Sequence, residues 1–568
     1  MQATVTKKDY LIWIIILIAA LARLWGINFG LPHTGCRPDE SIITDIVYSP
    51  LHSFHPGTFN YPSLYKYMVL CLYIFYFFIG IITGRYHSIV EFLTEYQMRP
   101  DNFYLINRFL SAFLGVISVF VLYKIARYVF DRKTAIISAL FLGLAYLHVR
   151  DSHFGTVDVA LSFFIICSLW FIVKAREGKG CRDYLMAGVL AGLAASTKYQ
   201  GALLFLPMFI VHVLNLWEET EKDARQFFDK RLLLFISAFI ALFLLGTPYA
   251  ILDFPHFISD IIYEFRHLKY GHGIALGGWY HVRFSLFFGL GWSLFFASLA
   301  GIITLAIMDA KKAIMLCSFP LVYYLFMARG NTVFLRYIIP LIPFLCLTAA
   351  VFTVQVGGRF GPHLNHGVAF ILAVLILLPS TQSIILSVRL LARKDNRLIA
   401  AEWINKNTAQ GSSFYQASLF PPGKVQLYPT LGSLPETHYN PITKIAYRIP
   451  ASVRSDMGSY LKNKNIVGFQ DWSYNPQVRK FLYKGEIKEI LPDYIIVEES
   501  PLVVYSVSES GIPEILGKSY NLKKTFNVID VCAKENWFDQ QDAFYLPFHG
   551  FRGIERPGPN LYIYEKKR

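Results

Sequence analysis

The chain has 568 residues, of which 54% are hydrophobic, 16% aromatic and only 16% charged. A soluble globular chain carries about a quarter charged residues. This composition, with a mean hydropathy of +0.40, excludes a disordered or fibrous protein and an ordinary cytosolic enzyme, and it predicts a polytopic α-helical membrane protein. The formal net charge of +15 fits cytoplasmic loops that face anionic membrane lipid, so we expect no nucleic-acid partner.

Apolar runs alternate with short polar segments through the first 391 residues. A helix needs about 20 mostly apolar residues to cross the hydrocarbon core. The candidate runs are 10–27, 64–83, 104–123, 134–148, 157–173, 184–197, 200–217, 231–250, 284–308, 312–328, 334–356 and 367–391. The first run continues into Arg23-Leu-Trp25 without a small-residue cleavage site, so we expect it to be a membrane span and not a signal peptide.

The amino-acid composition changes near residue 392. After it, charged residues, Pro, Asn and Ser are frequent, and no apolar run is long enough to span a membrane. We therefore predict a membrane region over 1–391 and a water-soluble domain over 392–568. Segments typical of strands and of a helix indicate that the second region is a small α/β domain. They are the strands 494–497, 526–529 and 561–564 and the helix 397–407.

Clusters of Lys and Arg set the predicted orientation, because short basic loops stay in the cytoplasm. Lys7 and Lys8 place the N-terminus there too. The clusters are Lys124/Arg127/Arg132/Lys133, Lys174/Arg176/Lys179/Arg182, Lys222/Arg225/Lys230/Arg231 and Lys311/Lys312. If both 10–27 and 64–83 cross, all of these clusters are exported. The conflict disappears if 64–83, which is rich in Tyr and Phe, lies in the membrane interface. Residues 28–103 then form one long external loop, and the C-terminal domain is external.

With this topology, unusual polar residues gather on the external side. Ionisable groups at membrane depth are costly and usually functional, although each one alone is equally explained as a snorkelling or paired interfacial charge. They are Asp39 and Glu40 after the first run, Arg108 and Asp158 at the start of later runs, Arg266 and His267 in the loop after 231–250, and Arg336 at the start of 334–356.

Asp39 and Glu40 are the most specific of these residues. Pro38 restricts the backbone immediately before them, and they follow the first run closely. A carboxylate in this place can act as a general base for a hydroxyl. The structural alternative is that Asp39 caps a helix over 40–48, where carboxylates interact favourably with the helix dipole.

These residues belong to an ordered set of motifs that resembles the GT-C superfamily of polytopic glycosyltransferases. The resemblance is closest to the phospholipid-carrier-dependent branch, which contains the protein O-mannosyltransferases and the lipid A aminoarabinose transferase. It covers nearly the whole membrane region. The motifs are Pro38-Asp39-Glu40, Phe59-Asn-Tyr-Pro62, Arg108-Phe-Leu-Ser-Ala-Phe-Leu-Gly115, Asp158, Thr197-Lys198 near Gly201, Arg336-Tyr-Ile-Ile-Pro340 and Asp395-Asn-Arg397 with Trp403-Ile404.

The resemblance implies about eleven to thirteen membrane-spanning helices, a long first external loop and a C-terminal external domain. It also implies a reaction in which a sugar leaves a polyprenyl monophosphate, as in dolichyl-phosphate mannose, and joins an acceptor hydroxyl with inversion. Asp39 would be the base and Glu40 its support. The aminoarabinose transferase type carries a Lys just before the Pro of the second motif. Here Tyr61 occupies that position, and Lys66 is only a weak substitute.

Cations aimed at the donor phosphate should carry much of the catalysis, because negative charge develops there in the transition state. Arg336 is the first candidate, since a guanidinium holds phosphate oxygens bidentately. Lys198, Arg266 and His267 follow it. Arg108, Asp158, Lys66 and Tyr61, whose ring can stack on a sugar, complete the expected substrate-binding set.

The sequence does not support a catalytic metal or another cofactor. The seven cysteines include no C-x-x-C pair, and His148, His153, His267 and His272 follow no recognised metal-binding spacing. A divalent metal therefore stays an open alternative without support.

We thus expect an inverting glycosyltransferase of the plasma or inner membrane whose active site is external or periplasmic. Its partners would be membrane lipid, a polyprenyl-phosphate-linked sugar and an acceptor protein, lipid or glycan. Two other interpretations remain open, a polytopic transporter and a non-enzymatic receptor or assembly protein. Against a transporter, the charges gather at one face, and the sequence shows no repeated halves with broken helices.

The predicted topology can be tested by cysteine labelling from each side of the membrane. Single cysteines replacing Arg85 or Glu91, in a background without the seven native cysteines, should react with an impermeant reagent from the external side. The reason is that 64–83 is expected not to cross. Labelling of both positions from the cytoplasm alone would contradict this topology.

Overall fold

The computed structural model describes residues 10–218, 229–270, 277–418, 423–427, 436–440, 444–463, 468–502, 505–530, 535–542 and 544–568. The basic residues Lys7, Lys8, Lys222 and Arg225 lie outside these ranges. The chain folds as two compact units. The first contains Met1–Trp25, Ser49–Leu70 and Asn107–Ile385, and the second contains Gly26–Tyr48, Cys71–Ile106 and Leu386–Arg568. Two segments of the predicted external loop therefore group with the C-terminal region, and the predicted boundary at 391 stays a prediction.

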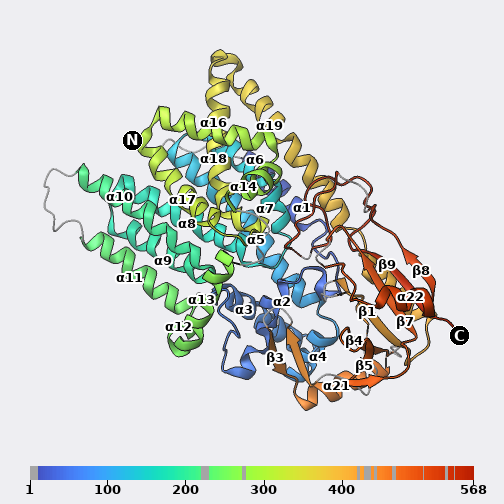
Figure 1. Cartoon of the computed structure of the whole chain (residues 1–568). Helices are drawn as coiled ribbons and strands as arrows, with labels where there is room; N and C mark the ends of the chain where they lie inside the picture. The colour runs from blue at the N-terminus through green and yellow to red at the C-terminus, as the bar shows by residue number, and fades with distance from the viewer. Residues whose placement is uncertain are drawn as a thin grey trace. The chain divides into compact units, whose positions relative to one another are not determined.

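The first unit is helical throughout its described part, as the apolar runs predict. Its helices follow one another with short connections (Figure 1). They are α1 (Tyr10–Leu24), α3 (Leu64–Ile82, shared between the units), α5 (Asp101–Val129, also shared), α6 (Arg132–Gly143), α7 (Tyr146–Asp151), α8 (Val157–Gly178), α9 (Cys181–Thr197), η3 (Tyr199–Leu204), α10 (Phe205–Trp217), α11 (Lys230–Gly246), α12 (Tyr249–Leu252), α13 (Phe254–Tyr270), α14 (Gly277–Tyr280), η5 (His281–Leu286), α15 (Phe287–Leu290), α16 (Trp292–Met308), α17 (Ala310–Ala328), η6 (Leu335–Leu341), α18 (Ile342–Gly358) and α19 (Gly361–Leu391).

Seven helices in the described ranges are long and apolar enough to cross a membrane, or eight if one bent pair is a single span. They include α3, whose length and composition allow it to cross a membrane. The interfacial position that the sequence analysis expects for 64–83 stays a prediction. Other predicted runs form shorter helices, such as α1 with 15 residues, α6 with 12, and α9 and α11 with 17 each. The membrane-protein class is confirmed, and the number of about eleven to thirteen spans stays a prediction.

Glycine allows two helices of the first unit to approach closely. A Cβ atom at Gly188 or Gly192 of α9 would lie 2.3 Å from the carbonyl oxygen of Phe235 or 2.5 Å from that of Phe239, both on α11. Small residues four apart are the usual device for close helix packing in lipid, where no hydrophobic driving force acts between helices. The α9–α11 contact therefore depends on these two glycines.

A further glycine has a conformational role at the bent pair. The helical segments Gly277–Leu290 and Trp292–Met308 meet at an angle of 110°. Gly291 lies between them with φ of +77°, and a Cβ atom there would come within 2.9 Å of the backbone nitrogen of Ser380. The π-helical turn η5 precedes this break, as is common where a helix deviates from regular geometry.

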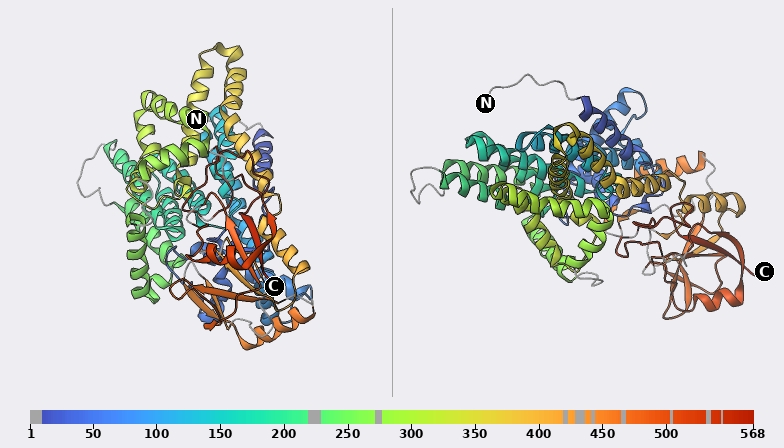
Figure 2. Two further views of the ribbon diagram at one scale, coloured as in Figure 1. Left: turned by 45° about the vertical axis from the view of Figure 1, so that its right-hand side comes forward. Right: turned by 90° about the horizontal axis from the view of Figure 1, so that it is seen from above.

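The second unit is built around a mixed seven-stranded sheet (Figures 1 and 2). The strand order is β6-β5-β4-β1-β7-β9-β8; β1 runs parallel to β4 and β7, and the other neighbours are antiparallel. Strands β2 and β3 form a separate hairpin. The strands are β1 (Ser413–Ala417), β2 (Thr437–Asn440), β3 (Ile445–Arg448), β4 (Gln470–Asn475), β5 (Lys480–Tyr483), β6 (Glu486–Lys488), β7 (Tyr494–Glu499), β8 (Tyr520–Phe526) and β9 (Asn560–Lys566).

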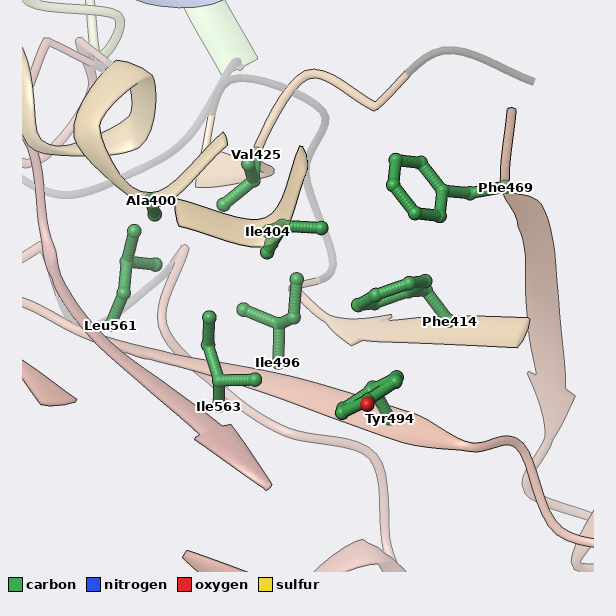
Figure 3. Close-up of a cluster of buried hydrophobic side chains, with 9 residues drawn as sticks. All are labelled: Ala400, Ile404, Phe414, Val425, Phe469, Tyr494, Ile496, Leu561 and Ile563. Carbon is green, nitrogen blue, oxygen red and sulfur yellow. The ribbon is translucent and has the colours of Figure 1, made fainter. Parts of the chain in front are cut away.

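Alternating side chains place one helix on each face of this sheet. Phe414 and Ile496 point toward α20 (Asn396–Asn407) and pack with Ala400, Ile404 and the other residues drawn in Figure 3. Tyr415 and Ile495, one position along each strand, pack instead with Ile512 of α22 (Ile512–Ser519). The period of two residues along a strand explains this division. The remaining helical elements are η1 (Thr34–Cys36), α2 (Glu40–Thr44), η2 (Asp45–His52), α4 (Ile89–Met98) and α21 (Ala451–Asn463).

The α/β character predicted for the C-terminal region is confirmed. The expected helix 397–407 is α20, and the expected strands 494–497 and 561–564 lie in β7 and β9. The strand expected at 526–529 is wrong, because β8 ends at Phe526. The amides of Val528 and Ile529 donate to the side-chain oxygen of Asn560, at 2.8 and 3.0 Å, so they are not available to a continuing ladder.

The close α9–α11 contact leads to a stability prediction. Gly188→Val should lower the melting temperature of the detergent-solubilised protein, because the new side chain meets the α11 backbone; overpacking of this kind costs about 1–3 kcal/mol. Gly367→Ala in α19 is the matched control, since a Cβ atom at that position would meet nothing within 4 Å. Equal melting temperatures for the two variants would contradict the packing argument.

Candidate active site

A buried cluster of three ionisable side chains lies in the first unit. Asp158 sits in the first turn of α8, Lys198 between α9 and η3, and Arg336 in η6. Lys198 Nζ is 2.7 Å from Asp158 Oδ1, and Arg336 Nε is 3.6 Å from Asp158 Oδ2. The exposed fractions of the three residues are 1%, 5% and 4%. With two cations for one carboxylate, the cluster keeps a net charge of +1 and is suited to an anion.

Aromatic rings surround the two cations. Lys198 Nζ lies 4.4 Å from the ring centre of Tyr337 and 5.8 Å from that of Tyr61, while Arg336 Cζ lies 4.2 Å from that of Phe334. Cation–π contacts of this kind strengthen as water is removed. They fix the direction of the cationic groups without neutralising their charge.

A pocket of about 210 Å³ opens beside this cluster. Its polar lining residues come from four separate segments, namely Asn60 and Tyr61, Lys198 to Gln200, Glu264 with His267, and Tyr337. Apolar side chains such as Leu203 and Phe326 complete the wall. The pocket combines a cation, a hydroxyl-bearing ring and an acid, which are groups that a phosphorylated or hydroxylated ligand can contact.

A larger apolar cavity of about 830 Å³ lies in the same unit. It is lined almost wholly by carbon, from residues of α10, η5, α16, α17, η6 and α18. Its lining residues Leu206, Leu325 and Leu341 lie within four residues of Leu203, Phe326 and Tyr337, which line the polar pocket. This arrangement suits a ligand with a polar head and a long apolar tail.

Glu264 adds a titratable acid to the polar pocket. Burial raises the pKa of its carboxyl group, the nearby charge of Lys198 opposes this shift and that of Asp260 adds to it, so that the pKa is about 7. The carboxyl is therefore largely neutral below pH 7 and ionised above it. Ionisation would reduce the net charge of the four groups Asp158, Lys198, Arg336 and Glu264 from +1 to zero.

The structure thus brings together five of the predicted substrate-binding residues, Arg336, Lys198, Asp158, Tyr61 and His267. The sequence did not single out Glu264, Asn60 or Tyr337 as site residues, although Asn60 and Tyr337 lie inside quoted motifs and Glu264 lies near Arg266 and His267. For Glu264 a signal existed, because Glu264 and His267 are three residues apart on a helix and share one face.

Three other predicted residues do not line this pocket. Arg108 is fully buried in α5, and Arg266 is exposed on α13 because its position on the helix turns it away from the face of Glu264 and His267. Lys66 Nζ donates to the carbonyl oxygens of Pro56 and Thr58, at 3.1 and 2.9 Å, and to the Thr58 hydroxyl at 3.2 Å. Since an ammonium group has three donors, these contacts assign Lys66 to holding the loop before Tyr61.

The predicted acidic pair lies in the second unit. Asp39 occupies the N-cap position of α2, but its side chain makes no capping hydrogen bond to the described residues of that helix. Asp39 is half-buried and Glu40 is fully buried. The helix expected over 40–48 is divided into α2 and the tighter turn η2. The geometry does not support a capping role for the Asp39 carboxylate. Its role as a general base stays a prediction.

Asp45 anchors the segment that carries this pair. Its carboxylate accepts hydrogen bonds from Tyr96 (2.6 Å), His438 (3.0 Å) and Asn440 (2.6 Å). Burial lowers the pKa of His438, but the Asp45 charge and hydrogen bond outweigh it, so that this pKa is raised overall. The β2–β3 hairpin and α4 thereby hold the end of α2.

The residues before the acidic pair are anchored in the same way. Arg37 is fully buried and forms an ion pair with Asp542. Cys36 Sγ lies 3.5 Å from Asp395 Oδ2, and that carboxylate pairs with Arg397 at 2.7 Å. His33 donates to the carbonyl oxygen of Lys424 at 2.6 Å. Side chains from the C-terminal region therefore fix the backbone on both sides of Asp39 and Glu40.

The histidines considered for a metal site do not come together in the described residues. His148 contacts Arg23 at 3.0 Å, His153 contacts the carbonyl oxygens of Val149 and Trp25, and His272 lies outside the described ranges. A different group, His55, Asp253 and His256, does have ligand atoms close together. The Gly57 amide donates to His55 Nδ1, which puts the proton of a neutral ring on Nε2, where it donates to Asp253 at 3.0 Å. In the structure these side chains form a hydrogen-bonded group, and the question of a metal stays as the sequence left it.

Part of the chain is similar to known proteins. Residues 105–248 match the family described as dolichyl-phosphate-mannose-protein mannosyltransferase. Dolichyl-phosphate-mannose–protein mannosyltransferase 1 of Saccharomyces cerevisiae is 28% identical over 158 residues, which are 26% of this chain and 18% of that protein. Mannosyltransferase 5 of the same organism is 25% identical over 234 residues, 38% of this chain and 28% of that protein. These matches cover less than a third of either relative.

Among solved structures, ArnT from Cupriavidus metallidurans in the apo state is similar over 98% of this chain and 97% of that chain. The sequence identity is 12% and the TM-score is 0.51, so this likeness concerns the fold. Together these findings confirm the resemblance to the GT-C superfamily of polytopic glycosyltransferases.

The titration of Glu264 leads to a prediction on the binding of a sugar polyprenyl phosphate, the donor that the sequence analysis predicts. A sugar polyprenyl phosphate is a phosphodiester whose charge does not change near neutral pH. Its affinity should fall by roughly tenfold as the pH rises through about 7, because ionised Glu264 cancels the remaining positive charge. Glu264→Gln should keep the low-pH affinity throughout. An unchanged pH dependence in this variant, measured by equilibrium binding, would assign the titration to another group, such as His267.

Proposed function

We propose that the chain is an inverting glycosyltransferase that moves a sugar from a polyprenyl monophosphate to an acceptor hydroxyl on the external face of the membrane. The observation that carries this proposal is the buried Asp158–Lys198–Arg336 cluster beside a polar pocket. A net positive charge buried in a membrane-embedded helical unit needs an anionic ligand to balance it, and a lipid phosphate supplies one.

The apolar cavity supports a lipid-linked donor over a water-soluble one. A polyprenyl chain would occupy the carbon-lined space of about 830 Å³, while its phosphate would lie one turn away at the polar pocket. The sugar would then stack on an aromatic ring of that pocket, for which Tyr61 is the candidate. A nucleotide sugar would leave the apolar cavity without a role.

In the proposed reaction, the Asp39 carboxylate takes the proton of the acceptor hydroxyl. The acceptor oxygen forms a bond to the anomeric carbon as the bond from that carbon to the phosphate oxygen breaks. Polyprenyl phosphate leaves with the bonding electrons, and Arg336 and Lys198 stabilise the negative charge that develops on it. Because phosphate is already a good leaving group, no general acid is needed on that side.

Glu40 supports Asp39 in this proposal. It is fully buried, while Asp39 is half-buried and therefore able to meet an acceptor. Arg37 and Asp45, held by the C-terminal region, would keep the pair in a fixed orientation. Preorganisation of this kind is what a general base requires, since its oxygen must lie within hydrogen-bond distance of the acceptor hydroxyl.

The proposal is tested by a turnover assay with purified protein and radiolabelled polyprenyl-phosphate sugars. Release of free polyprenyl phosphate that requires an acceptor would establish transfer and exclude a transporter or an assembly protein. Membrane vesicles of the source cells supply candidate acceptors of all three classes, protein, lipid and glycan. Absence of release with every mannosyl, glucosyl and aminopentosyl donor would contradict the proposal.

Arg336 variants should separate charge from geometry. Arg336→Ala should reduce transfer by an amount equivalent to about 2.7–4 kcal/mol at the transition state, by analogy with the loss of one preorganised anion contact. Arg336→Lys should lose less, because it keeps the charge but not the forked donor geometry. Arg329→Ala, at an exposed arginine, is the matched control. Normal kinetics in a folded Arg336→Ala variant would assign the phosphate contact to Lys198 instead.

The test of Asp39 compares transfer rate and thermal stability in the same variants. Asp39→Asn should lower transfer by about 10²–10⁴-fold, the usual contribution of a general base, with donor binding and melting temperature nearly unchanged. Glu40→Gln should lower it less. A capping residue would instead show a stability loss of about 0.5–2 kcal/mol and a normal rate. That second pattern would remove Asp39 from the mechanism.

A further inference from the structure

A polar groove of about 570 Å³ lies between α4 and α21 in the second unit. The two helices run beside each other (Figure 1). Their facing residues line the groove, with Glu91, Thr94, Glu95 and Met98 from α4, and Asp456, Ser459, Tyr460 and Asn463 from α21. The volume is within the range of pockets that hold small organic ligands. Neither the predicted catalytic residues nor the donor pocket include any of these side chains.

The Glu95 carboxylate on the α4 wall of the groove is held by several donors. The Glu95 carboxylate accepts a bidentate pair from Arg85 (2.6 and 3.2 Å), the Tyr86 hydroxyl at 2.7 Å and the Asn102 amide at 3.0 Å. Burial raises the pKa of Glu95, but these donors outweigh it and lower the pKa overall. Glu95 therefore needs no ligand to balance its charge, and its carboxylate is held in a fixed position.

The α21 wall presents polar groups, of which Ser459 donates to the carbonyl oxygen of Ser455 at 3.2 Å within the helix. Asp456, Ser459, Tyr460 and Asn463 recur at intervals of three and four residues, which places them on one face of the helix. Within the described part of the chain, the Asp456 carboxylate has neither a hydrogen bond nor an ion pair. Arg99 lies over the ring of Tyr460, with its Cζ 5.4 Å from the ring centre.

A buried hydroxyl on the α4 wall also lacks a described partner, as the Asp456 carboxylate on α21 does. Thr94 lines the groove and is 6% exposed, yet its Oγ1 has no hydrogen-bond partner among the described residues. Buried hydroxyl groups are normally paired, and each exception requires an explanation such as a missing ligand or water. Thr94 and Asp456 therefore offer unused donors and acceptors from both walls.

The chemistry of these groups selects the class of ligand. A carboxylate, an amide, hydroxyls and a half-buried aromatic ring provide alternating donors and acceptors next to a flat apolar face. An anionic ligand is disfavoured, because Glu91, Glu95 and Asp456 outnumber Arg85 and Arg99. An apolar peptide is disfavoured too, since Met98 and Tyr86 are buried and the exposed lining is polar. A neutral saccharide satisfies both conditions.

We propose that the groove between α4 and α21 binds a neutral saccharide, and that the acceptor of the transfer reaction is consequently a glycan or a glycosylated molecule. The assignment of the acceptor rests on the proposed function. A structural link supports it, because the opposite face of α4 carries Tyr96, whose hydroxyl donates to Asp45 at the end of α2, directly after the acidic pair. One helix thus joins the groove to the segment that carries Asp39.

The binding test needs no donor and no turnover. Purified full-length protein is titrated with the neutral trisaccharides of mannose, glucose and N-acetylglucosamine, and binding is followed by saturation-transfer NMR. At least one should bind. Asp456→Asn should weaken binding by roughly tenfold to a hundredfold, the effect of losing a contact to a charged group, and Tyr460→Ala should also weaken it, because the aromatic ring that lines the groove is removed. Lys462→Gln, on the same helix outside the groove, is the control and should bind normally.

Three results of the binding test would overturn this inference. They are no saccharide binding at millimolar concentration, binding that Asp456→Asn and Tyr460→Ala leave unchanged, and binding of an unglycosylated peptide alone. Transfer activity with an unchanged KM for the acceptor in both variants would also overturn it and leave the proposed function standing. Saccharide binding that both variants abolish, in a protein without transfer activity, would support the groove and contradict the proposed function.

Discussion

The ionic contact of Asp158 with Lys198 and Arg336 is the interaction on which the first unit's candidate site depends. Its members come from three segments far apart in the sequence, and each is almost fully buried. A buried charge is tolerated only when it is paired, and removing one partner leaves the other uncompensated at a cost of several kcal/mol. Asp158 therefore joins α8, the end of α9 and η6, and it sets the position of both cations beside the pocket.

A comparable constraint operates in the second unit, where the C-terminal region holds the acidic segment. Asp542, Asp395, His438 and Asn440 contact the residues on either side of Asp39 and Glu40. These contacts explain why Gly26–Tyr48 groups with Leu386–Arg568 in one compact unit. The C-terminal region is thus more than an added domain, because its side chains fix the backbone that carries the proposed base.

Much of the architecture follows from the sequence because it depends on local patterns. Apolar runs predict the helices, since a backbone in lipid must satisfy its own hydrogen bonds. The short apolar runs rich in Ile, Val and Tyr predict the strands β7 and β9, and the change of composition near 392 predicts a second kind of fold. The strand expected at 526–529 fails because Asn560, distant in sequence, takes the amides that would continue the ladder.

By itself, the sequence determined the membrane class, the α/β character of the C-terminal region and most members of the candidate site, because residue type and spacing carry that information. Only the tertiary structure decided which of the predicted residues meet. It brings Lys198, Asp158 and Arg336 together, directs Lys66 to the loop at Pro56 and Thr58, and turns Arg266 outward. The physical reason is that contacts between distant segments depend on helix packing and on the rotation of each helix, which no local pattern specifies.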